Sequence, residues 1–80
     1  VTSASGGISL DATGAAGDSV SINAVVSSAT GAVDIDAGDG VLVSDDIATT
    51  GGVDIEAGAG AITRGAATDV ITGGFVQLSA

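Results

Sequence analysis

The sequence predicts an all-β protein, a parallel β-helix (β-solenoid) of about three and a half coils. Each coil is expected to hold roughly 20–25 residues in three short strands. Three observations predict this fold: a five-residue pattern that occurs five times, glycine-containing corners, and a composition of small and β-branched residues. The chain has 80 residues, of which 14 are glycine and one is aromatic. Helices are disfavoured because glycine costs roughly 1 kcal/mol relative to alanine inside a helix.

The repeated pattern is [Val/Ile]-x-[Ile/Leu]-x-Ala, in which apolar and polar residues alternate. This period of two places the aliphatic side chains on one face of a strand and the polar side chains on the other. Each copy is therefore expected to form a strand that is buried on one face. The five copies are residues 8–12, 20–24, 33–37, 53–57 and 76–80.

Small turn residues precede four of the five copies. Glycine permits positive φ where a chain turns, so we expect these residues to be the corners of the coils. They are Gly6-Gly7, Gly31-Ala32, Gly51-Gly52 and Gly73-Gly74.

The distance between equivalent copies is that of a solenoid repeat. The first residues of four copies, Ile8, Val33, Val53 and Val76, are 25, 20 and 23 residues apart (33 − 8, 53 − 33, 76 − 53). Repeats of this length with one supersecondary unit each are typical of solenoids. The expected coils are residues 6–30, 31–50, 51–72 and 73–80, in one segment that we expect to be a fragment of a longer repeat protein with open ends.

The remaining strands follow from a second repeated block, in which residues 18–26 match residues 39–47. Equivalent residues of stacked coils lie ~4.8 Å apart, so the inward residues should form columns. Around residues 60–65 either Ile62 or the pair Ala61 and Thr63 faces inward, and we favour Ile62. The expected columns are Ile8/Val33/Val53/Val76, Leu10/Ile35/Ile55/Leu78 and Ala12/Ala37/Ala57/Ala80 on the first strand, Val20/Val41 and Ile22/Val43 on the second, and Val26/Ile47/Val70 on the third.

The composition excludes several classes of function. The chain has no Cys and no His, which excludes a thiol nucleophile, a disulfide framework, a zinc finger and an imidazole base. Ten acidic residues against one basic residue give a formal net charge of −9, so neither nucleic acid nor anionic lipid is an expected partner. No apolar run approaches the roughly 18 residues of a membrane span, so membrane insertion is not expected. We expect no enzymatic activity, because the aromatic and cationic substrate contacts of a glycosidase cleft are missing.

Carboxylates at the outward positions of the first strand are the candidate functional residues. Asp34 should lie one coil from Asp54, and Asp36 one coil from Glu56. Two such charges ~4.8 Å apart in water repel by roughly 0.9 kcal/mol, which a bound Ca²⁺ would relieve. These four residues are the candidate Ca²⁺ ligands, and Asp45-Asp46 is a second candidate at an expected corner. The alternative is a solvated outer face that keeps the solenoid soluble.

Three segments resemble the degenerate repeats of filamentous-haemagglutinin-type exoproteins and related autotransporter passengers. They are Gly-Gly-Val-Asp-Ile-Glu-Ala-Gly at 51–58, Gly-Asp-Gly-Val-Leu-Val at 38–43, and the ending at 72–80. The resemblance covers nearly the whole chain and rests on composition and period. It implies a right-handed parallel β-helix, export through the outer membrane of a Gram-negative bacterium, and a place on the cell surface.

The expected function is that of a structural or adhesive β-solenoid segment in a surface-exposed or secreted bacterial fibre, a rigid scaffold for cell-surface attachment. The expected partners are neighbouring solenoid coils or sister subunits, and cell-surface glycans or matrix are further candidates. Two alternatives stay open: a self-stacking extracellular filament subunit and a calcium-stabilised carbohydrate-binding module.

Overall fold

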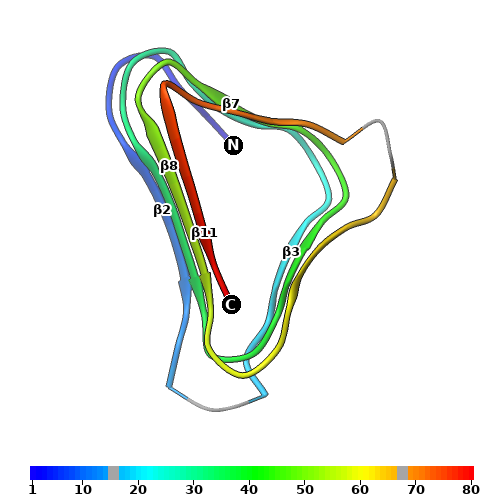
Figure 1. Cartoon of the computed structure of the whole chain (residues 1–80). Helices are drawn as coiled ribbons and strands as arrows, with labels where there is room; N and C mark the ends of the chain where they lie inside the picture. Colours follow the sequence, from blue (N-terminus) through cyan, green and yellow to red (C-terminus); the bar gives the residue numbers. More distant parts are fainter. Residues whose placement is uncertain (15–16, 67–68) are drawn as a thin grey trace.

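The chain forms a triangular β-solenoid. The computed structural model describes residues 1–14, 17–66 and 69–80, which form eleven strands and no helix. Figure 1 views the solenoid along its axis, and the chain turns anticlockwise as it approaches the reader, which makes the coil right-handed. The predicted fold class is therefore confirmed. No helix long and apolar enough to cross a membrane occurs in these ranges.

The strands form three parallel sheets, one on each side of the triangle. The first sheet consists of β2 (Ile8–Ala12), β5 (Val33–Ala37), β8 (Gly52–Ala57) and β11 (Phe75–Ser79). The second sheet consists of β3 (Val20–Ile22), β6 (Val41–Val43) and β9 (Ile62–Arg64). The third sheet consists of β1 (Thr2–Ser3), β4 (Val26–Ser28), β7 (Ile47–Thr49) and β10 (Ile71–Thr72). The expected coils 6–30 and 51–72 include residues outside the described ranges, so the coil boundaries stay a prediction.

The core consists of the aliphatic columns that the sequence predicts. Ile35 pairs with Leu10 in the coil before it and with Ile55 in the coil after it, and Ile35 and Ile55 are fully buried. In the second sheet Val41 and Val43 are the buried partners of Val20 and Ile22. Burying one such side chain contributes roughly 1.5–3 kcal/mol. The buried apolar residues of the described ranges are Ile8, Ile22, Val26, Val33, Ile35, Ala37, Val41, Val43, Ile47, Val53, Ile55 and Ala57.

The columns continue into the last strand, where their residues are exposed. Val76 and Leu78 of β11 pair with Val53 and Ile55 as expected, and they are 40% and 50% exposed. Ala80, expected to extend the alanine column, lies beyond the end of β11 and is exposed. The apolar columns are therefore accessible at this end of the described coil.

The third sheet differs from the prediction at its last strand. Ile71, and not Val70, is the partner of Ile47. A shift of one residue moves a side chain to the other face of a strand, and Val70 is accordingly 50% exposed while Ile71 packs against the core. The amide of Val70 donates to Oδ1 of Asp46 at 2.9 Å, and its carbonyl accepts from the amide of Ile47 at 2.9 Å. These two bonds to the coil before it hold Val70 outside the core, so the expected column Val26/Ile47/Val70 is wrong at its last member.

The structure settles the ambiguous register in the third coil and adds one strand. Ile62 is the partner of Val41 and packs against the core, whereas Ala61 and Thr63 are exposed, so the favoured register is confirmed. The strand β1, whose residues pair with those of β4, was not expected from the sequence.

Close approach of neighbouring coils, and not positive φ, explains two of the corner glycines, Gly31 and Gly51. Among the described residues only Gly14 has a positive φ, at 128°. A Cβ on Gly51 would lie 2.7 Å from the carbonyl oxygen of Gly31, and a Cβ on Gly31 would overlap the backbone of Gly6. The reason expected from the sequence, conformational freedom at the turn, is therefore wrong for Gly31 and Gly51.

Buried hydroxyl groups bind neighbouring coils together at the same corner. Ser28 donates to the carbonyl oxygen of Gly6 at 2.8 Å and accepts from the amide of Gly31 at 3.0 Å. Thr49, one coil later, donates to the carbonyl oxygen of Gly31 and accepts from the amide of Gly51 at 3.0 Å. Each buried hydroxyl therefore has a donor and an acceptor, which removes the cost of burying it.

We expect the substitution Gly51→Ala to destabilise the solenoid, because its Cβ would overlap the backbone of the coil before it. Overpacking of this kind costs about 1–3 kcal/mol. Gly52→Ala is the matched control, since a Cβ on Gly52 would meet only the carbonyl oxygen of Phe75, at an ordinary 3.8 Å. Thermal and urea unfolding followed by circular dichroism measure both variants. Equal stability of the two variants would contradict the close-approach explanation.

Candidate functional site

The candidate site is the outer face of the first sheet, which carries half of the acidic residues of the chain. Alternation along β2, β5 and β8 points the aliphatic residues inward, so the residues between them point out. We call this surface the acidic face. Its five carboxylates belong to Asp11, Asp34, Asp36, Asp54 and Glu56.

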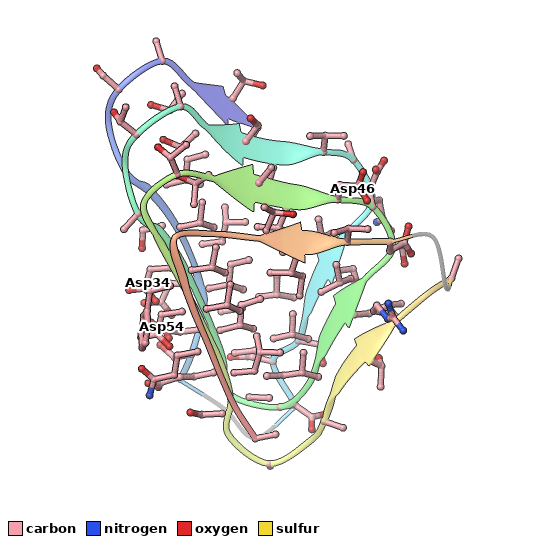
Figure 2. All side chains as sticks on the ribbon, turned by 45° about the horizontal axis from the view of Figure 1, so that its top comes forward. Asp34, Asp46 and Asp54 are labelled. Atoms are coloured by element: carbon pink, nitrogen blue, oxygen red, sulfur yellow. The ribbon has the colours of Figure 1, made fainter. Side chains whose placement is uncertain are left out.

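The register places the carboxylates side by side in neighbouring coils. Asp34 pairs with Asp54, and Asp36 pairs with Glu56 on one side and with Asp11 on the other. Figure 2 shows Asp34 and Asp54 together on one side of the solenoid, with their side chains directed away from the core. The sequence-based neighbours are therefore confirmed as neighbours, and Asp11 joins them.

Partial burial and like charges act on one carboxyl of this face, that of Asp36. The pKa of Asp36 is raised above its usual value of 3.8, first because partial burial desolvates the carboxyl. The negative charges of Asp34, Asp11 and Asp54 raise it further, and so does a hydrogen bond with Asp34. Oδ1 of Asp54 is buried and has no hydrogen-bond partner. The face therefore carries more negative charge than its surroundings compensate.

The carboxylates form pairs, and a Ca²⁺ site needs more oxygens than a pair supplies. In residues 1–14, 17–66 and 69–80, no three acidic, His or Cys side chains come together to hold a metal ion. Ca²⁺ takes six to eight oxygen ligands, the rest of which would have to be waters here. Calcium binding at Asp34, Asp54, Asp36 and Glu56 therefore stays a prediction.

Asp45 and Asp46, the second candidate, serve the corner between the second and third sheets. Oδ1 of Asp45 accepts from the amide of Asp46 at 2.8 Å, and Oδ1 of Asp46 accepts from the amide of Val70. Figure 2 shows Asp46 on the opposite side of the coil from Asp34 and Asp54. These two carboxylates therefore hold the backbone of a corner and do not belong to the acidic face.

One buried acidic residue, Asp69, was not expected from the sequence. Its Oδ2 accepts from the amide of Ala66 at 2.9 Å, and its carbonyl oxygen accepts from Nη1 of Arg64 at 3.4 Å. The residue is 8% exposed. Asp side chains commonly bind backbone amides in turns, so an Asp directly before an apolar pair was the available signal. Asp69 is therefore a structural residue of the turn.

Because the pKa of Asp36 is raised in the folded state, we expect protonation of this carboxyl to stabilise the protein. A folded-state pKa above the unfolded value means that the folded chain binds the proton more tightly. The stabilising contribution is present below the unfolded value of 3.8 and is lost as the pH rises through the raised pKa. We therefore expect Asp36→Asn to raise the melting temperature at neutral pH, with a gain that shrinks in acid.

Melting curves over a pH series compare the wild type with Asp36→Asn. Glu56→Gln is the matched control, since Glu56 is on the same face but is not a cause of the raised pKa. A gain of Asp36→Asn that is the same at every pH would contradict this account.

If Ca²⁺ binds the acidic face, we expect it to raise the melting temperature, because it would relieve the repulsion between paired carboxylates. Calorimetric titration and melting with and without EDTA measure the effect, and Asp34→Asn should reduce it. Asp45→Asn is the control on the other side of the solenoid. The absence of both heat and a melting shift would remove the calcium hypothesis.

Comparison with known proteins gives no identification: no family model, no curated protein and no solved structure matches the chain.

Proposed function

We propose that this chain is a rigid structural or adhesive segment of a bacterial fibre, surface-exposed or secreted, that serves as a scaffold for cell-surface attachment. The observation that carries the proposal is the unbroken stacking of equivalent residues from one coil to the next, as in Leu10, Ile35, Ile55 and Leu78. A repeat that packs only against its neighbours builds a rod whose length is set by the number of repeats. Such a rod holds its outer faces in constant positions.

The outer faces support a role in presentation and not in catalysis. The outward residues of the second sheet are Ser21, Leu42 and Thr63. In the third sheet, Ser27 pairs with Thr2 on one side and with Ala48 on the other. These side chains are uncharged, whereas the first sheet carries the acidic face. The resemblance to filamentous-haemagglutinin-type repeats supports an extracellular place and glycans or matrix as partners.

A second candidate, the self-stacking filament subunit, is favoured by the exposed end of the columns. Val76 and Leu78 of β11 are the counterparts of Ile8 and Leu10 of β2, so a second copy could continue the first sheet.

Electron microscopy of the purified chain separates the two candidates. We expect discrete particles, because the first proposal makes the chain a segment of a longer fibre and not a subunit that polymerises by itself. Long uniform rods would overturn the segment proposal in favour of the filament. Dilute denaturant tests whether any rods are stacks of folded chains or aggregates. Stacks of folded chains should disassemble as the circular dichroism signal of the fold is lost, and aggregates should not.

The adhesive role predicts that the folded chain is retained on a surface of glycans or matrix proteins. Arrays of immobilised glycans and matrix proteins measure the retention, and the Gly51→Ala variant, partly unfolded by heating, serves as the control for non-specific sticking. Retention should require the folded chain. Equal retention of folded and unfolded chain, or none on any surface, would contradict an adhesive role of this segment.

A further inference from the structure

A hollow lies on the outer side of the first sheet where β5, β8 and β11 run together. Its volume is about 320 Å³, and its lining includes Asp34, Asp54, Gly52, Phe75 and Gln77. Phe75 pairs with Gly52, and Gln77 pairs with Asp54, so these four residues occupy neighbouring outward positions on two strands. Gly52 has no side chain, which leaves the space between the phenyl ring and the carboxylates open.

The space at Gly52 is open because glycine has no side chain, and neighbouring atoms do not fill the position that a Cβ would occupy. A Cβ placed there would meet only the carbonyl oxygen of Phe75, at 3.8 Å. This differs from Gly51, where the backbone of the coil before it excludes a side chain. The only aromatic residue of the chain therefore stands beside an unfilled position, and it is 67% exposed.

The hollow carries negative charge that the described residues leave uncompensated. Asp34 and Asp54 are direct neighbours across β5 and β8. Oδ1 of Asp54 is buried and has no hydrogen-bond partner, while the residue as a whole is half-buried. Arg64, the single basic side chain of the sequence, belongs to the second sheet and donates to the carbonyl oxygen of Asp69. A cation that enters the hollow would supply the missing positive charge.

We propose that this hollow binds an alkylguanidinium or alkylammonium group, with Asp34 and Asp54 supplying the charge and Phe75 an aromatic surface. Organic cations are attracted to aromatic rings and shed water more easily than small metal ions do. Gln77 adds an amide oxygen as an acceptor. Two carboxylates and one amide fall short of the six to eight oxygens of a Ca²⁺ site, so the organic cation fits this surface better. The site goes beyond the scaffold role and does not depend on it.

Nuclear magnetic resonance titration of the isotope-labelled chain tests this site, with ethylguanidinium chloride as the probe and sodium chloride at equal ionic strength as the blank. We expect saturable shifts of the signals of Gly52, Asp54 and Phe75. Shifts that do not saturate, or that sodium chloride reproduces, would overturn the proposal. Stronger binding of Ca²⁺ than of ethylguanidinium, with the same signals shifted, would overturn it as well.

Two variants separate the contributions of the ring and the charge. Phe75→Leu keeps an apolar side chain and removes the ring, and we expect it to weaken binding about two- to fivefold. Asp54→Asn removes a charge and should weaken binding up to about fivefold. Asp11→Asn is the control, because Asp11 is on the acidic face but does not line the hollow. An equal loss in Asp54→Asn and Asp11→Asn would indicate a general charge effect and contradict the site.

The cation can be a free small molecule or a basic side chain of a partner protein. A blocked tripeptide with a central arginine distinguishes these sources when it is titrated beside ethylguanidinium. Tighter binding of the peptide assigns the site to a basic side chain of a partner, and equal or weaker binding assigns it to a small molecule. Failure of both probes to bind overturns the site and leaves the scaffold proposal unaffected.

Discussion

The fold depends on one constraint, the parallel in-register stacking of equivalent residues in successive coils. Ile35 lies between Leu10 and Ile55, and the same holds for Val33 between Ile8 and Val53. Each aliphatic side chain therefore packs against a side chain of similar shape, and a narrow core of Val, Ile and Ala reaches full burial without aromatic residues. The constraint also reaches the corners, where the coils come so close that Gly51 and Gly31 leave no room for a Cβ.

The same register has the opposite effect on the outside of the first sheet. The pairing of β5 with β8 that places Ile35 beside Ile55 also places Asp34 beside Asp54 and Asp36 beside Glu56. Attraction inside and repulsion outside are thus two results of a single pairing. The repulsion adds to the desolvation that raises the pKa of Asp36. Because hydrophobic burial outweighs the repulsion of partly solvated charges, the solenoid tolerates an acidic face.

The three sides of the triangle differ in chemistry although they share one repeat. The first sheet is acidic, and its last strand adds the exposed ring of Phe75 beside Gly52. The outward side chains of the second and third sheets are small or uncharged, as at Ser21 and Ser27. The acidic face and the exposed aromatic ring therefore lie on one side of the solenoid. The scaffold role and the proposed cation site are therefore compatible.

The sequence by itself determined the strand pattern, the aliphatic columns of the first two sheets and the neighbours on the acidic face, because alternation decides which way a side chain points. It did not determine the register after a loop. Whether Val70 or Ile71 enters the core depends on the bonds that the Val70 backbone makes to the neighbouring coil, and two adjacent aliphatic residues look alike in a pattern. The strand β1 was also missed, although Ser-Ala-Ser-Gly at 3–6 resembles Ser-Ala-Thr-Gly at 28–31. Only the tertiary structure placed a ring beside an empty glycine position and left an oxygen of Asp54 without a donor, because both depend on how separate coils meet.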